Sequence, residues 1–252
     1  IMDSADFWSI QRARVYARDS IPLVFLGASR TLYAIDRETV LTRLPGYAPV
    51  MLARDGEYPL ATLRDLAEDT SFNGVVICDL DAVAFSTLGI DMQRPMVDFY
   101  HQQFTPSRAM HRLLLSHWQR QSVLARPDFS LTRAVLRVWK QEPEPFHPFQ
   151  WLNLRRFGFI DFSAGDPEPH RQELVRNLES FNGHFPRFPF DEWWPQVEAS
   201  HGWVKAIQAR GGEVIFYASP TSGFRREVFE DWAPRAEYWD KMAAVSPAKV
   251  MN

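Results

Sequence analysis

Residues 22–36 read Pro-Leu-Val-Phe-Leu-Gly-Ala-Ser-Arg-Thr-Leu-Tyr-Ala-Ile-Asp, and this stretch decides the fold that we expect. The unbroken apolar run from Leu23 to Leu26 is typical of a strand buried on both faces, and Gly27 ends it in a tight turn. Ser29 therefore lies where a parallel strand passes into a helix. In open α/β sheets, ligands bind outside the carboxyl ends of the strands. A serine at this point is a candidate nucleophile beside unpaired backbone N–H groups.

The elements that follow alternate between strands and helices. Asp36 is placed to cap a helix, a second strand is expected at 49–53, a helix at 60–67 and a third strand at 75–80. This alternation is the signature of a parallel sheet with right-handed crossovers. The sequence therefore predicts an α/β fold.

The pattern resumes near the end of the chain. A helix is expected near 194–209, a strand at 213–218, a helix at about 225–232 and a final strand from Lys249. Residues 3–18 predict an imperfectly amphipathic helix that packs on the outside of the domain.

Between about residues 87 and 194 the alternation breaks down. We expect helices at 110–124 and 131–139, and a proline-rich stretch at 142–148 favours extended or turn conformations. Residues 1–252 are thus predicted to form one α/β domain with a mainly helical and irregular insertion at about 87–194, where loops commonly build a substrate site. Because the chain begins with isoleucine and stops as a strand begins, we expect it to be truncated at both ends.

Composition excludes several functional classes. The net charge is −3, the pI is near 6.2 and the charges are interspersed, which argues against a nucleic-acid partner or a polybasic membrane patch. The single cysteine, Cys78, is expected to be a core thiol and leaves the redox compartment open. No His-x-x-x-His or paired-cysteine spacing suggests a metal, and we expect no cofactor.

Gly27-Ala28-Ser29-Arg30 resembles the Gly-x-Ser block of SGNH/GDSL-type hydrolases, in the Gly-x-Ser-Arg form of cell-envelope members similar to DltD and the alginate O-acetylation proteins. Gly56, after the second strand, falls where that superfamily keeps its second-block glycine. The resemblance covers residues 20–85 and 213–220. It implies a flavodoxin-like three-layer fold, with Ser29 as nucleophile and the backbone N–H groups of Ser29 and Gly56 in the oxyanion hole.

The sequence departs from this family at two blocks. The third-block asparagine is missing, and Asp79 or Asp81 stands near its place, although an ionised carboxylate cannot donate to an oxyanion. The Asp-x-x-His block, which supplies the base and its orienting carboxylate near the C-terminus of the family, has no match there, and the last histidine, His201, precedes the final strands. Either a C-terminal segment is absent from this sequence or the chain is a member without the full catalytic apparatus.

Site assignments follow from the resemblance and from the position of these residues. Ser29 is the predicted catalytic residue, with the helix N-cap as its ordinary alternative. Arg30, Asp79 and Asp81 are assigned to substrate binding, because an arginine beside the nucleophile suits an anionic group. His101 is the histidine to test if the base comes from the insertion.

Three functions remain open on the sequence. The first is an extracytoplasmic serine esterase or O-acyltransferase acting on acyl groups of a cell-envelope polymer such as an acylated polysaccharide, with a membrane-bound acyltransferase as a partner and an N-terminal anchor outside this sequence. The second is a non-catalytic member that serves as a binding or assembly component of an envelope polysaccharide system. A third, a cytoplasmic flavodoxin-like binding protein, would be favoured by a native N-terminus without a signal.

Overall fold

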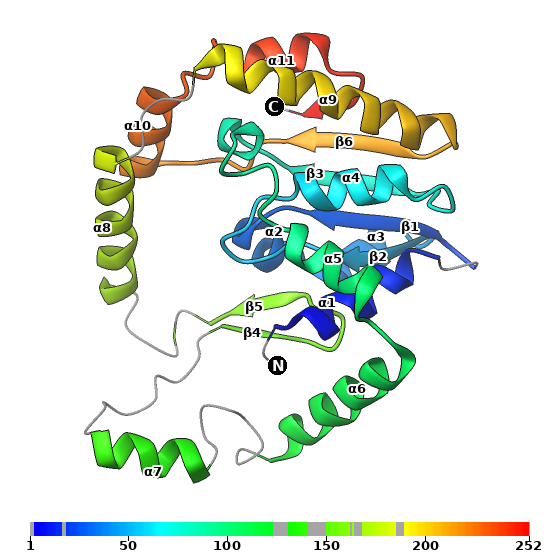
Figure 1. Cartoon of the computed structure of the whole chain (residues 1–252), viewed down its shortest axis with the longest axis vertical. Coiled ribbons are helices and arrows are strands. Elements are labelled where there is room, and N and C mark those ends of the chain that lie inside the picture. Colours follow the sequence, from blue (N-terminus) through cyan, green and yellow to red (C-terminus); the bar gives the residue numbers. More distant parts are fainter. Residues whose placement is uncertain are drawn as a thin grey trace.

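A five-stranded parallel sheet forms the centre of the molecule. The computed structural model describes residues 3–16, 19–122, 131–140, 150–161, 163, 168–184 and 189–251. The strand order is β2-β1-β3-β6-β7 (Figure 1), with β1 at Ile21–Leu26, β2 at Tyr47–Met51, β3 at Val75–Asp79, β6 at Glu213–Tyr217 and β7 at Lys249–Met251. The chain winds outward from β1 in both directions, so the strand order reverses between β1 and β3. This reversal is where open α/β sheets bind ligands.

Helices connect the strands and a small antiparallel hairpin lies beside the sheet. The helices are α1 Ala5–Arg12, η1 Ala13–Tyr16, α2 Ser29–Ala34, α3 Arg37–Arg43, α4 Leu60–Glu68, η2 Ala82–Phe85, α5 Arg94–Gln102, α6 Pro106–Gln121, α7 Leu131–Lys140, α8 Glu168–His184, α9 Phe190–Ala209, α10 Gly223–Trp232 and α11 Trp239–Val245. The hairpin pairs β4, Gln150–Leu152, with β5, Gly158–Ile160.

The predicted α/β fold is confirmed, with small shifts in the element ends. The second strand begins two residues earlier than expected, and the predicted cap at Asp36 accepts a hydrogen bond from the Thr39 N–H at 2.8 Å. The predicted final strand is β7. The proline-rich stretch at 142–148 lies outside the described residues.

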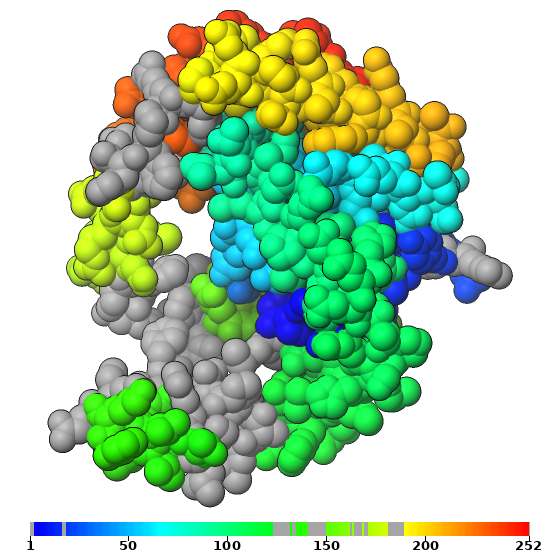
Figure 2. Space-filling model, viewed as in Figure 1, coloured from blue at the N-terminus to red at the C-terminus, as the bar shows by residue number. Residues whose placement is uncertain are grey.

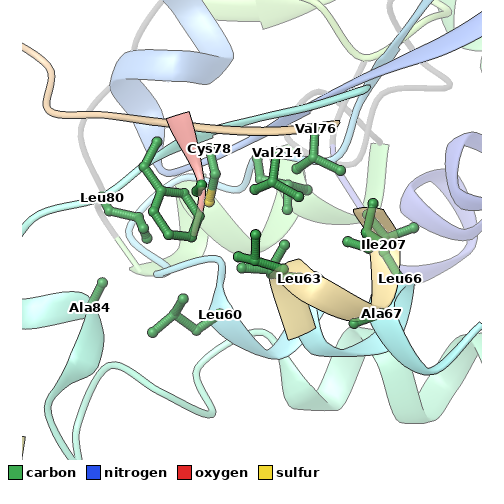
Figure 3. Close-up of a cluster of buried hydrophobic side chains, with 14 of the residues drawn as sticks. Leu60, Leu63, Leu66, Ala67, Val76, Cys78, Leu80, Ala84, Ile207 and Val214 are labelled. Carbon is green, nitrogen blue, oxygen red and sulfur yellow. The ribbon is translucent and has the colours of Figure 1, made fainter. Parts of the chain in front are cut away.

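The two faces of the sheet bury different side chains, because alternate residues of a strand point to opposite sides. On one face, helices α4, α9 and α11 cover the inward side chains of β1, β3 and β6. Figure 3 shows part of this cluster around Cys78, which is fully buried as expected. On the other face, Leu23 and Phe25 of β1 pack with Leu32 of α2 and with Phe157 beside the hairpin. Both faces of β1 are thus buried, as its unbroken apolar run predicts.

Helix α1 is buried, so the prediction that it packs on the outside is wrong. Phe7 and Trp8 are both 0% exposed. As neighbours in the helix they point in different directions, and each joins a different one of the two apolar clusters. The Trp8 indole N–H also donates to the Leu52 carbonyl at 3.0 Å. A helix that is buried on two sides has no single apolar stripe for a sequence pattern to reveal.

A buried charge network attaches α1 to α4. Arg12 is 0% exposed and donates from Nε to Asp65 at 2.6 Å and from Nη2 to Asp69 at 2.8 Å. The Tyr16 hydroxyl donates to the same Asp69 oxygen. Burial acts to raise the pKa of Asp69, but the hydrogen bonds from Tyr16 and Arg12 outweigh it and lower the pKa. The N-terminal helix is therefore held by ionised partners as well as by apolar packing.

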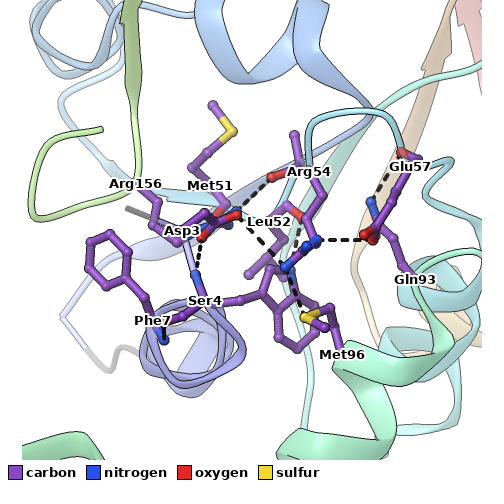
Figure 4. A network of polar contacts seen from close by, with 12 residues as sticks. Asp3, Ser4, Phe7, Met51, Leu52, Arg54, Glu57, Gln93, Met96 and Arg156 are labelled. Carbon is purple, nitrogen blue, oxygen red and sulfur yellow. Dashed lines mark hydrogen bonds and ion pairs between the residues drawn. The ribbon is translucent and has the colours of Figure 1, made fainter. Parts of the chain in front are cut away.

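A second buried arginine clamps the hairpin and the N-terminal segment to the end of β2 (Figure 4). Arg156 is 0% exposed, donates to both carboxylate oxygens of Asp3 at 2.6 and 2.7 Å, and also donates to the Met51 and Ala53 carbonyls, each at 3.0 Å. These two carbonyls lie where β2 ends, so the clamp fixes the start of the loop that carries Gly56.

We expect Trp8→Ala to lower the free energy of unfolding by about 3–5 kcal/mol, because it empties a buried site and leaves the Leu52 carbonyl without its donor. The matched control is Trp118→Ala, whose side chain is 62% exposed and whose effect should stay within about 0.5 kcal/mol. Urea unfolding measures both. Equal effects of the two substitutions would show that α1 is not buried.

We expect Asp69→Asn to destabilise the protein at neutral pH and to lose this effect in acid. The folded-state pKa of Asp69 is lowered, so its carboxylate contributes stability above the ordinary aspartate pKa of about 3.9, and that stability is lost as the pH falls below it. Unfolding curves recorded at a series of pH values from 7 downward measure the difference in free energy of unfolding between the wild type and the variant. The control Asp19→Asn replaces an exposed carboxylate, and its effect on the free energy of unfolding at pH 7 should stay within about 0.5 kcal/mol.

Candidate functional site

Loops at the carboxyl ends of β1, β2, β3 and β6 bring the predicted site residues to one edge of the sheet. Helices α8 and α10 lie beyond this edge (Figure 1), and Figure 2 shows an opening between α8 and the body of the molecule. The edge is therefore open to solvent on this side.

Gly27 allows α2 to start close to β3. Its φ is +155°, and a Cβ at this position would lie 2.2 Å from Thr31 Oγ1 and 2.9 Å from the Asp79 Cβ. Any side chain would force Thr31 or Asp79 to move, so the glycine is required by the space as well as by the backbone conformation.

Ser29 is half-buried and is the first residue of α2, whose N-cap is Ala28. Its hydroxyl makes no hydrogen bond to any residue in the described part of the chain. At the starts of other helices, Ser4, Asp36 and Thr105 do accept a backbone hydrogen bond as caps. The N-cap interpretation of Ser29 is therefore wrong, and its hydroxyl has no structural role in the described residues.

Asp79 ties three elements together at the centre of the edge. Its carboxylate is almost fully buried and accepts from the Ser219 N–H at 3.0 Å, the Ser219 hydroxyl at 2.7 Å and the Thr31 hydroxyl at 3.3 Å. Thr31 also lies 3.0 Å from the Tyr217 hydroxyl. The carboxylate thus joins β3, α2 and the loop after β6, and both of its oxygens already accept hydrogen bonds.

Arg30 turns toward the same loop and lies between the two carboxylates. It donates to the Ser219 carbonyl at 2.9 Å, and its guanidinium nitrogens lie 3.8 Å from Asp79 and 3.6 Å from Asp81. The side chain is 27% exposed, so part of the guanidinium can still meet a ligand. The structure therefore brings Arg30, Asp79 and Asp81 together.

Asp81 is more exposed than Asp79, with 18% of its side chain open to solvent against 2%. It caps η2 through the Val83 N–H at 3.1 Å and accepts from the Tyr58 hydroxyl at 3.4 Å. Burial raises its pKa, although Arg30 and Arg225 act in the opposite direction. Burial also raises the pKa of Tyr58 well above 10, so this phenol remains a hydrogen-bond donor.

Gly56 lies in an exposed turn with φ +71°, and no atom lies within 4 Å of the place a Cβ would take. Two contacts hold this turn against the Gly27 turn. The Arg54 N–H donates to the Gly27 carbonyl at 3.0 Å, and the buried Gln93 amide lies 3.4 Å from both the Gly27 and the Glu57 carbonyls. The two glycine turns are therefore neighbours, as the predicted oxyanion pair requires.

The histidines whose side chains are described make no hydrogen bond to Ser29. His101 Nε2 lies 2.6 Å from Asp65, in the Arg12 network. His201 lies on α9, and burial lowers its pKa. His111 and His117 are exposed on α6. Within the described side chains, the site therefore contains the serine and the glycine turns but not a base bonded to that serine.

Four polar residues of this edge were not predicted from the sequence, namely Thr31, Tyr58, Gln93 and Arg225. Tyr58 could have been found from its place directly after the second turn. Gln93 comes from the insertion, and only the folded chain shows that it reaches Gly27. Among the described residues, no group of three or more His, Cys, Asp or Glu side chains could hold a metal ion.

Neither a family model, nor a curated protein, nor a solved structure matches this chain. In the described ranges, no helix has both the length and the apolar character needed to cross a bilayer. The site must therefore be interpreted from its own geometry.

Three glycine substitutions test the geometry of the two turns. Gly56→Ala should cost about 1–2 kcal/mol of unfolding free energy, because only its positive φ opposes a side chain. Gly27→Ala should cost more, because it also displaces Thr31 or Asp79. The control Gly46→Ala has open space and no positive φ, so its effect should stay within about 0.5 kcal/mol. Urea unfolding ranks the three variants by their free energy of unfolding. A Gly27→Ala protein as stable as Gly46→Ala would contradict the close approach of Thr31 and Asp79 to Gly27.

Proposed function

We propose that this protein is an SGNH-like serine esterase or O-acyltransferase that acts on acyl groups of a cell-envelope polymer. The observation that carries the proposal is the position of Ser29. Its hydroxyl makes no hydrogen bond to a described residue, and it follows a glycine that admits no side chain, at the sheet edge where α/β proteins bind ligands. This combination suits a nucleophile better than a structural serine.

In the proposed reaction, Ser29 Oγ attacks the ester carbonyl carbon and passes its proton to a base. The N–H groups of Ser29 and Gly56 donate to the oxyanion of the tetrahedral intermediate. The intermediate collapses to an acyl-serine, and the polymer hydroxyl leaves with a proton. Water or an acceptor hydroxyl then attacks the acyl-serine and regenerates Ser29, giving hydrolysis or transfer respectively.

Arg30 suits a substrate with negative charge near its ester. Its partly exposed guanidinium is oriented by the Ser219 carbonyl and by the two carboxylates, so it is positioned before a ligand arrives. Asp81 and Tyr58, on the other side of Arg30, offer hydrogen-bonding groups that suit hydroxyls of a carbohydrate. We propose an acylated polysaccharide as the substrate, an extracytoplasmic location, and a membrane-bound acyltransferase as the partner in the transfer reaction.

The reaction requires a base that the described side chains do not provide at Ser29. The resemblance assigns this role to an Asp-x-x-His block near the C-terminus, where residues 1–252 show no match. The same spacing occurs at Asp98 and His101 of α5, but His101 Nε2 lies 2.6 Å from Asp65. The second candidate function is therefore a non-catalytic binding or assembly component of an envelope polysaccharide system. It is favoured by Asp79, whose oxygens accept from Ser219 and Thr31 at the place where the family keeps an oxyanion donor.

A fluorophosphonate probe and p-nitrophenyl acetate distinguish the two functions in the full-length protein. We expect labelling and turnover in the wild type and in Ser222→Ala, and the loss of both in Ser29→Ala. Ser222 is a matched control because it lies at the same edge and its hydroxyl caps no helix. An intact protein that neither labels nor turns over would reject the enzyme and favour the binding component.

A further inference from the structure

Helix α6 turns several polar side chains toward the protein and a row of large apolar side chains, beside the exposed His111 and His117, toward solvent. Arg112, Ser116 and Gln119 are at most 8% exposed, and they lie on the side that packs against α1. Ser116 Oγ is buried without a hydrogen-bond partner among the described residues. A helix that is stabilised by the core of its own domain has the opposite arrangement.

The outer side of α6 carries large apolar side chains at helical spacing. Met110, Leu114 and Trp118 recur every four residues, so they form one row along the helix. They are 59%, 64% and 62% exposed, and Leu113 beside them is 41% exposed. Contiguous exposed apolar surface of this kind marks a contact site, whereas single exposed side chains do not.

Helix α7 repeats the pattern at the same end of the molecule. Val135, Val138 and Trp139 are 61%, 81% and 80% exposed, and their spacing puts them on one side of the helix. Figure 1 shows α6 and α7 together at the end of the molecule opposite α9 and α11. We call the exposed apolar side chains of these two helices the α6/α7 face.

The charges of these helices are of one sign. Together α6 and α7 contain six Arg or Lys residues and no Asp or Glu, in a chain whose net charge is −3. Arg120 is next to Leu113 on the helical wheel of α6, and Lys140 follows Trp139 directly. The even mixture of charges in the whole sequence conceals this local excess of cations.

Apolar side chains flanked by cations, with tryptophan among them, match the boundary between the headgroups and acyl chains of an anionic bilayer. The alternative of a second copy is opposed by charge, because two α6/α7 faces in contact would bring cations against cations. A nucleic acid would meet the cations but would leave the apolar row without a partner.

We propose that the α6/α7 face is a peripheral membrane-binding surface for anionic lipid. The apolar rows enter the interface, the exposed side chains of Arg120 and Lys140 meet lipid phosphates, and the sheet stays outside the bilayer. The proposal is independent of the chemistry at Ser29, since none of its residues belongs to that site.

Sedimentation with vesicles tests the surface on the full-length protein. We expect binding to vesicles of phosphatidylglycerol and phosphatidylcholine in equal parts, and weaker binding to phosphatidylcholine alone or at high salt. Leu114→Glu/Trp118→Glu should weaken binding by about tenfold or more. The matched control, Leu44→Glu/Val245→Glu, places one carboxylate directly after α3 and one at the end of α11, at residues that are 41% and 50% exposed, and it should bind as the wild type does.

Charge reversal separates the electrostatic contribution to vesicle binding from the contribution of the apolar side chains. Arg120→Glu/Lys140→Glu should weaken binding to the anionic vesicles and leave any binding to phosphatidylcholine unchanged. The proposal is overturned if the wild type does not bind anionic vesicles, or if Leu114→Glu/Trp118→Glu binds them equally well. Light scattering gives the oligomeric state of the same proteins. A wild type that forms a dimer but binds no vesicles, together with a monomeric Leu114→Glu/Trp118→Glu, would assign the α6/α7 face to a second copy instead.

Discussion

The carboxylate of Asp79 is the interaction on which the arrangement of this edge depends. A nearly buried carboxylate without partners would be costly, so its oxygens must be satisfied by neighbouring groups. The groups that satisfy it come from α2 and from the loop after β6, which are far apart in the sequence. Gly27 makes this possible by leaving room for Thr31 to approach. The position of Ser29, two residues before Thr31, follows from the same contact.

The rest of the molecule supports this edge through two buried arginines. Arg12 joins the N-terminal helix to α4, and Arg156 joins the N-terminal segment and the hairpin to the end of β2. Each guanidinium is fully buried but paired with carboxylates, the condition under which burial of a charge is tolerated. The N-terminal segment carries Arg12 at the end of α1 and accepts hydrogen bonds from Arg156 through Asp3. It is therefore part of the core and not a surface addition.

The sequence predicted the sheet well because its strands are continuous apolar runs, and an unbroken run such as 23–26 has few other interpretations. It predicted the site less completely. Ser29 and Arg30 follow β1, Asp79 is the last residue of β3, and Asp81 comes two residues later. Their shared edge could therefore be deduced from the order of elements alone. Gln93 and Arg12 could not be predicted, because their partners are brought to them only by tertiary packing. Trp8 was misplaced for the same reason, since no pattern within one helix shows that both of its sides are covered.

The proposed membrane face and the proposed site are compatible in space. In Figure 1 helices α6 and α7 lie at one end of the molecule, while the strands run across the view and end beside α8 and α10. If the α6/α7 face rests on a bilayer, the strands run roughly along its surface and the carboxyl edge opens sideways. Such a site would meet a polymer that extends along or away from the membrane more readily than an acyl chain within it. Surface binding and reaction at Ser29 would then use different parts of one molecule, and each can be lost without the other.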